Sequence, residues 1–166
     1  MQQETHLRHL KMQVQRKLHQ CLQVAEAYFH RQFSIPNINY KVRGMKAGIA
    51  YLQHNEIRLN PILLLENSEE FIGEVVPHEL AHLLVYQLFG RVKPHGKEWK
   101  NIMQNVFHLE PQIYHQFDTS NVVKSVFPYE CGCKVHYLTI RRHNNIQNGQ
   151  IMCFCKECKF KLRFKP

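Results

Sequence analysis

The segment "VVPHELAHLLVYQLFG", residues 75–90, is apolar almost throughout but carries two histidines and a glutamate in its middle. Its apolar character predicts a buried helix that ends at Gly90. The helix should begin or kink at Pro77, because proline lacks an N–H group and clashes with the preceding turn. Burying an ionisable side chain without a partner costs several kcal/mol. We therefore expect the histidines and the glutamate to share a ligand.

These three residues, His78, Glu79 and His82, form the pattern H-E-x-x-H. Residues four positions apart lie on one face of a helix, with Cβ atoms about 5–6 Å apart, so the two imidazoles can bind one zinc ion. Glu79, one position further on, then faces the space beside the metal. The pattern predicts a zinc site with a carboxylate next to it.

A third protein ligand is expected, because a catalytic zinc site usually has three and leaves the fourth position to water. Six residues after His82, where astacin-like enzymes place their third histidine, the chain has Leu88, which excludes that class. The preferred candidate is His95 in "KPHGKEW", which a chain turning back after Gly90 would present to the metal. Glu98, one turn along the following helix, is the competing candidate.

The hydrophobic pattern of residues 1–120 predicts an α+β domain in which helices pack on a small antiparallel sheet. Amphipathic helices are expected over residues 5–31 and 96–108. Extended segments are expected over residues 37–44, 47–52 and 56–60. The last two should be joined by a tight turn.

Two further helix starts are predicted between the sheet and the quoted segment. Asn60 followed by Pro61 is typical of a helix cap and a first helical position. Asn67, with Glu70 three residues later, has the spacing of a capping box. A short helix is therefore expected after Asn60, and a second start signal precedes the helix that carries the histidines.

The positive charge is concentrated near the C-terminus. Residues 124–166 contain nine Lys and Arg against two Glu, a net charge of +7, whereas residues 1–123 carry a net charge of +2. A basic module commonly binds nucleic acid, although a solubilising surface explains the same charge equally well.

No segment reaches the roughly 18 uncharged apolar residues of a membrane span, and the first residues are too polar for a signal peptide. We therefore expect a cytoplasmic protein without membrane association. In that reducing environment the six cysteines should be thiols or metal ligands rather than disulfides.

Four cysteines form two close pairs near the C-terminus, in the sequences "CGC" and "CKEC". Four thiolates can enclose a structural zinc ion tetrahedrally and can fold a small unit that has little core. A zinc ribbon is therefore expected over residues 125–166, with a module boundary near residue 120. The expected ligands are Cys131, Cys133, Cys155 and Cys158, with Cys153 and His136 as alternatives.

Within this ribbon, Asn148-Gly149 is typical of a hairpin turn and would join strands over residues 134–143 and 150–155. The aromatic residues Tyr137, Phe154 and Phe160 could stack on unpaired bases or form the small core. The basic side chains that could hold phosphates are Arg141, Arg142, Lys156, Lys159, Lys161 and Arg163.

The segments "IRLN", "PHELAHLLVY", "HGKEW" and "YECGC…CKEC", in this order and spacing, resemble the SprT-like family of bacterial proteins. The family shares its domain with Spartan-type DNA-dependent metalloproteases. The resemblance implies a zincin-like α+β fold, a catalytic zinc ion on His78, His82 and His95, and Glu79 as the catalytic base. It also favours the four paired cysteines over Cys153 as ligands of a second, structural zinc ion.

Residues and resemblance together predict a zinc-dependent metallopeptidase. Its substrates would be proteins or peptides, with proteins bound or crosslinked to DNA as candidates. The substrate would lie extended along residues 47–52 or 56–60. Tyr51, Tyr86 and Tyr114 are candidate donors to the oxyanion. The alternative is a nucleic-acid-binding regulatory protein whose zinc sites are structural and which has no peptidase activity.

Overall fold

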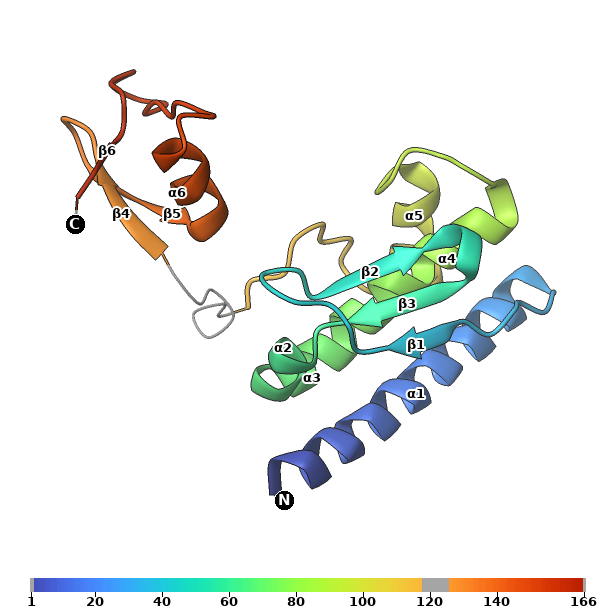
Figure 1. The fold of residues 1–166 in the computed structure, drawn as a ribbon. Coiled ribbons are helices and arrows are strands. Elements are labelled where there is room, and N and C mark those ends of the chain that lie inside the picture. Colours follow the sequence, from blue (N-terminus) through green and yellow to red (C-terminus); the bar gives the residue numbers. More distant parts are fainter. Residues whose placement is uncertain (1, 118–125, 166) are drawn as a thin grey trace. The chain divides into compact units, whose positions relative to one another are not determined.

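The chain folds into two compact units, Met1–Val122 and Val123–Pro166. The computed structural model describes residues 2–117 and 126–165 (Figure 1). The predicted module boundary near residue 120 lies outside these described residues. Within them, no helix combines the length and the apolar character that crossing a membrane requires.

The first unit contains a three-stranded sheet in the order β1-β3-β2 (Figure 1). Its strands are β1 (Asn37–Asn39), β2 (Gly48–Tyr51) and β3 (Glu56–Leu59). β2 and β3 are antiparallel and joined by a single 3₁₀ turn, as predicted. β1, however, runs parallel to β3, so the prediction of a purely antiparallel sheet is wrong. The reason is that residues 40–47 form a connection rather than a tight turn and carry the chain past the position that β3 later fills.

The first helix, α1 (Gln2–Phe29), matches the amphipathic segment predicted over residues 5–31. Its buried side chains recur every three or four residues, at Leu10, Val14, Leu18, Leu22 and Ala25. This face packs against α4 and α2. The long helix therefore closes one side of the core that holds the quoted segment.

Asn60 is fully buried and starts α2 (Pro61–Glu66) as predicted, because its side-chain oxygen accepts from the N–H groups of Ile62 and Leu63. Its amide also donates to the carbonyls of Gly44 and Lys46, which ties down the connection that enters β2. One side chain thus fixes both a helix start and the approach to an edge strand.

A helix starts directly after Asn67, as predicted, but without the expected capping bond. The Asn67 side chain makes no capping bond to α3 (Ser68–Glu70) and instead donates to the carbonyl of Leu63, 3.2 Å away. The reason is that α3 follows α2 after a single residue, so the Leu63 carbonyl near the end of α2 is the nearest acceptor for the amide.

The quoted segment forms α4 (Val76–Phe89), which continues from α3 through a π-helical turn at Phe71–Val75. Pro77 lies in the first turn of α4, directly after this wider turn, where its missing N–H is tolerated. Gly90 ends the helix with a φ of +72°, and its N–H donates to the carbonyl of Tyr86. Both boundaries agree with the prediction.

The helix predicted over residues 96–108 consists of α5 (Lys97–Asn101) and a π-helical turn at Ile102–Val106. Both parts contact α4. The side chains they bury are Trp99, Ile102, Met103 and Val106. The connection over residues 90–96 therefore returns the chain to α4, as predicted from the need for a third ligand.

The described residues of the second unit, 126–165, form three antiparallel strands in the order β5-β4-β6 and one helix. They are β4 (Val126–Glu130), β5 (Val135–Thr139), α6 (Ile140–Gln147) and β6 (Arg163–Phe164). Its buried core is small and consists of Tyr129, Leu138, Cys155 and Leu162. A core of this size leaves the unit dependent on other sources of stability.

The hairpin predicted at Asn148-Gly149 is wrong. The hairpin of this unit joins β4 to β5 instead, and residues 140–143, expected to end the first strand, lie in α6. Gly149 follows the end of α6 with a φ of +69°. An Asn-Gly pair suits the end of a helix as well as a hairpin turn, because both need a residue in the left-handed region.

Candidate metal centres

Three imidazoles in the first unit converge on one point. His78 and His82 stand one turn apart on α4, and His95 lies in the connection to α5. The Nε2 atom of His95 is 3.1 Å from each of the other two, which are 3.3 Å from each other. Glu98, the competing third ligand, is not part of this group. His95 has a φ of +54°, in the left-handed region, which marks the sharp turn that presents its ring to α4.

The spacing of the three nitrogens fits a single tetrahedral metal ion. Zinc–nitrogen bonds of about 2.0–2.1 Å place neighbouring ligand nitrogens about 3.3–3.4 Å apart. The observed separations are 3.1–3.3 Å. Three neutral ring nitrogens so close together can form few hydrogen bonds among themselves, whereas one cation satisfies all three lone pairs. The group could therefore hold a metal ion through Nε2 atoms.

Trp99 holds this group in place. Its buried ring lies against all three imidazoles, with ring centroids 4.7 Å from His78 and His95 and 5.6 Å from His82. Its indole N–H donates to the backbone carbonyl of His78, 3.3 Å away. The helix that follows His95 thus forms one wall of the cluster and is bonded to the helix that carries the other two rings.

The cluster is kept neutral and ready to bind a cation. Burial, together with the neighbouring His95, lowers the pKa of His78 to about 4, although a hydrogen bond to the backbone of Gln112 opposes this. Burial and the other two rings lower the pKa of His82 to about 3. Burial also lowers the pKa of His95. At neutral pH all three rings therefore lack the second proton that would block a ligand lone pair.

Glu79 lies beside the histidines and is 7% exposed. Burial raises the pKa of its carboxyl group to about 7, against the opposing effects of the Ala50 backbone and Lys46. A carboxyl group with a pKa near neutrality can both accept and return a proton under physiological conditions.

The histidines and Glu79 line an open cavity of about 1200 Å³ in the first unit. One side of this cavity is β2, which contributes Gly48, Ile49 and Ala50, and another is the segment over residues 108–117. β2 is an edge strand, because β3 lies between it and β1. The cavity is therefore large enough for an extended chain and is bordered by a strand with one free edge.

In the second unit, Cys131, Cys133, Cys155 and Cys158 bring their sulfur atoms within 4.8 Å of one another. The separations are 3.3 Å between Cys131 and Cys133 and 3.7 Å between Cys133 and Cys155. Zinc–sulfur bonds of about 2.3 Å in a tetrahedron place sulfur atoms about 3.8 Å apart. The four thiols therefore could hold a second metal ion. They come from the β4–β5 turn and from the loop before β6.

Of the two alternative ligands in this unit, His136 is adjacent to the sulfur cluster and Cys153 is outside the group. The Nε2 atom of His136 is 3.2 Å from Sγ of Cys131. Burial raises the pKa of Cys131, but hydrogen bonds from the Cys133 backbone and from His136 outweigh it and lower the pKa to about 5. His136 is thus placed to stabilise a thiolate in the cluster.

Comparison with known proteins identifies the family. The model of the SprT-like family matches residues 18–115, which is more than half of the chain. The chain belongs to the SprT-like family. The matched residues include the three histidines and Glu79, so the cavity described above is part of the SprT-like domain.

Bacterial relatives resemble the chain over nearly its whole length. Protein SprT of Pasteurella multocida (strain Pm70) is 67% identical over 162 residues, which cover 98% of both chains. Protein SprT of Actinobacillus succinogenes is 58% identical over 162 residues, 98% of this chain and 95% of the relative. Protein SprT of Serratia proteamaculans is 49% identical over 155 residues, 93% and 91% of the two chains. No solved structure matches the chain.

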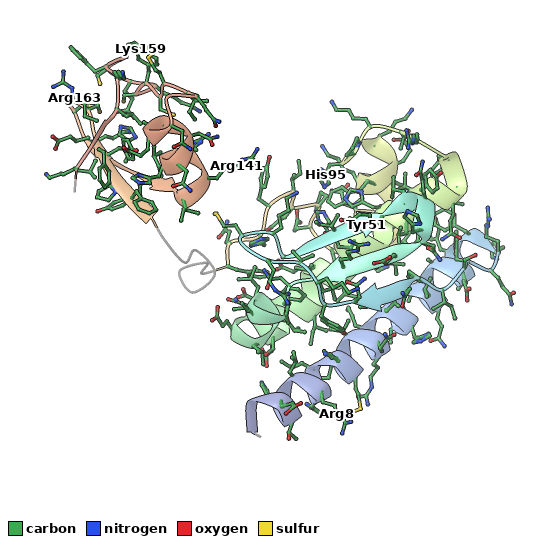
Figure 2. All side chains as sticks on the ribbon, in the orientation of Figure 1. Arg8, Tyr51, His95, Arg141, Lys159 and Arg163 are labelled. Carbon is green, nitrogen blue, oxygen red and sulfur yellow. The ribbon has the colours of Figure 1, made fainter. Side chains whose placement is uncertain are left out.

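The basic residues predicted to contact nucleic acid are all exposed. Figure 2 shows Arg141 on α6, on the opposite side of the second unit from Arg163, with Lys159 at a third place. Arg141 and Arg142 were expected near the end of a strand and lie instead in the first turn of α6. The three labelled residues therefore lie on different parts of the second unit of this SprT-like protein.

The three aromatic residues considered as base-stacking or core residues are exposed, namely Tyr137 at 69%, Phe154 at 55% and Phe160 at 67%. The interpretation that they form the small core is therefore wrong. The core is built from Tyr129, Leu138 and Leu162 around Cys155.

Two residues of the cavity were not found by sequence reasoning. Gly48 faces Glu79, and His115 lines the cavity with a buried Nδ1 atom that has no hydrogen-bond partner. Gly48 gave no signal because a glycine in a short strand has several explanations. His115 lies outside any motif, and only its place next to Tyr114 could have drawn attention to it.

Proposed function

We propose that the chain is a zinc-dependent metallopeptidase with a zincin-like catalytic unit. His78, His82 and His95 are the proposed zinc ligands and Glu79 is the proposed catalytic base. The observation that carries the proposal is the convergence of three neutral imidazoles beside a buried carboxyl group in an open cavity. A purely structural metal site would not need the carboxyl group.

Zinc bound there would supply Lewis acidity, which lowers the pKa of a water ligand and polarises a peptide carbonyl. Glu79 takes the proton of the attacking water and passes it on to the leaving amine. Burial favours this role, because it raises the pKa of Glu79 to about 7 and so brings the group close to the pH at which it must act.

The substrate is an extended protein or peptide segment that pairs with β2. The sequence allowed pairing with β2 or with β3. β3 is hydrogen-bonded on both sides, whereas β2 lines the cavity and, among the described strands, has a neighbour on one side only. Backbone pairing binds a chain with little preference for its side chains. Unfolded or loosely folded proteins, including those bound or crosslinked to DNA, are therefore the proposed substrate class.

Among the candidate oxyanion donors, Tyr114 is favoured. It lines the cavity and its side chain is 83% exposed, whereas Tyr51 and Tyr86 are not among the lining residues. Figure 2 shows Tyr51 on the sheet. A tyrosine hydroxyl at the rim can donate to the oxygen on which negative charge develops.

Metal removal tests this function. We expect the purified chain to cleave an unfolded basic protein, to lose this activity completely after chelation, and to recover it when zinc is restored. The assay is run with and without single-stranded DNA, and zinc per chain is measured by atomic absorption.

The matched variant His95→Ala should bind one zinc ion fewer per chain and should not recover activity. Cleavage that survives complete metal removal, or a His95→Ala variant with full zinc and full activity, would contradict the proposal.

A second function, nucleic-acid binding by the second unit, is favoured by a separate observation. Tyr137, Phe154, Phe160 and Phe164 are exposed in this unit, which also exposes many Arg and Lys residues. Aromatic rings on which bases stack, next to cations that neutralise phosphates, are typical of single-strand binding surfaces. This function is compatible with peptidase activity and would bring the enzyme to DNA-bound substrates.

Salt dependence tests this binding. Each phosphate neutralised on a single strand contributes about −0.7 to the slope of log K against log salt. We expect Arg141→Gln/Arg142→Gln to weaken oligonucleotide binding and to reduce that slope by about 1.4, measured by fluorescence anisotropy. Arg8→Gln/Arg16→Gln on α1 removes the same charge and should leave the slope unchanged. If both double variants lowered the slope equally, the binding would be explained by non-specific attraction to the net charge of the chain.

A further inference from the structure

Gly48, the first residue of β2, packs directly against the side chain of Glu79. A Cβ atom added at Gly48 would lie 2.8 Å from Cγ, 2.9 Å from Oε1 and 3.1 Å from Cδ of Glu79. Carbon atoms in favourable contact are about 3.5–4.0 Å apart. Any residue other than glycine here would therefore collide with the carboxyl group in its present position.

The backbone conformation does not explain this glycine. The glycines with a left-handed φ are Gly44, Gly90 and Gly149, and Gly48 is not among them. Alanine could adopt the conformation of Gly48 without strain, since it lies in a regular strand paired with β3. What the position requires is the space that the missing side chain leaves for Glu79.

The peptide groups of Gly48 face the free edge of the sheet. Asn60 donates its N–H to the carbonyl of Ala47, so the pair of Ala47 and Asn60 is hydrogen-bonded across the two strands. In an antiparallel pair such residues alternate with residues whose peptide groups point outward. Ile49 therefore bonds to β3, whereas Gly48 points its N–H and C=O away from β3, where a further strand can pair with them.

We propose that Gly48 is a positioning residue for Glu79. Its missing side chain lets the carboxyl group lie against β2, next to the outward peptide groups that hold the substrate, so that the base and the scissile peptide meet at one place. This inference rests on the proposed peptidase function for its catalytic consequence. The contact between Gly48 and Glu79 stands independently of that function.

The first test is kinetic. A displacement of about 1 Å at a catalytic group can cost about 100-fold in rate, so we expect Gly48→Ala to lower kcat by about that factor. Zinc content and KM should stay close to wild type, because neither the imidazoles nor the outward peptide groups change. Gly73→Ala is the matched control, since a Cβ there meets nothing within 4 Å. Unchanged kcat in a folded, zinc-loaded Gly48→Ala would overturn the inference.

The second test does not depend on activity, so it also applies if Gly48→Ala folds poorly. If Glu79 is what the new Cβ meets, Gly48→Ala should lower the Tm of the wild type but not that of Glu79→Ala, where the space is empty. Tm is followed by circular dichroism in all four proteins of this cycle. The same loss of Tm in both backgrounds would show that Gly48 is needed for another reason. If the wild-type protein has no peptidase activity, the proposed function is refuted. The Tm comparison can still be evaluated in that case, because it does not depend on activity.

Discussion

Glu79→Gln should keep zinc at the wild-type level and lower kcat/KM for an unfolded protein by about 1000-fold. Glutamine has nearly the same shape as glutamate, so the contacts with β2 and the cavity wall are retained. It has no basic oxygen that can take a proton, and general base catalysis contributes about 10²- to 10⁴-fold to a rate. The loss should therefore be almost entirely in kcat. Initial rates of cleavage and zinc per chain, measured on the same preparation, check both parts.

Glu74→Gln is the matched control for this prediction. Glu74 also lines the cavity, but it is exposed and is not part of the histidine cluster. We expect this variant to keep at least half of the wild-type activity. Equal activity of Glu79→Gln and the wild type would rule out Glu79 as the base. Loss of zinc in Glu79→Gln would instead point to a structural role for the carboxyl group.

Cys155→Ser should release one zinc ion per chain and unfold the second unit. Cys155 is both a proposed ligand and one of the four residues that form the buried core among the described residues of that unit. Structural zinc contributes apparent binding free energies of about 10–16 kcal/mol in small zinc-folded peptides, far more than so small a core can supply. Loss of dispersed amide signals from residues 126–165 in an NMR spectrum, with those of residues 2–117 retained, would be the expected result.

Cys153→Ser provides the control for the cysteine cluster. Cys153 is partly buried beside the same core but lies outside the group of four sulfur atoms. This variant should keep two zinc ions per chain and a folded second unit. If it loses zinc as Cys155→Ser does, Cys153 belongs to the ligand set and the proposed four-cysteine site is wrong.

Much of the first unit could be predicted from sequence because its signals are local. The spacing of apolar residues gave α1, and Pro77 and Gly90 gave the boundaries of α4. The Asn60 cap could also be predicted from sequence, because the residue that follows it is a proline. The parallel pairing of β1 could not be read in this way, because it depends on where a connection places a strand relative to one that comes later in the chain.

The second unit shows where local signals are ambiguous. Asn148-Gly149 fits a hairpin turn and a helix end equally well, and α6 has no buried residue that would give it a clear helical stripe. The convergence of His95 with His78 and His82 was predicted from motif spacing. The packing of Gly48 against Glu79 joins two segments about thirty residues apart and is visible only in three dimensions.

Trp99 is the chain's single tryptophan, and its ring touches all three imidazoles. Indole emission is sensitive to charge and to paramagnetic ions within contact range. Filling the histidine site with cobalt or copper should therefore quench nearly all of the protein's intrinsic fluorescence. The chain therefore contains an intrinsic optical probe of metal binding at the histidine site, and loading can be followed in real time without attaching a dye.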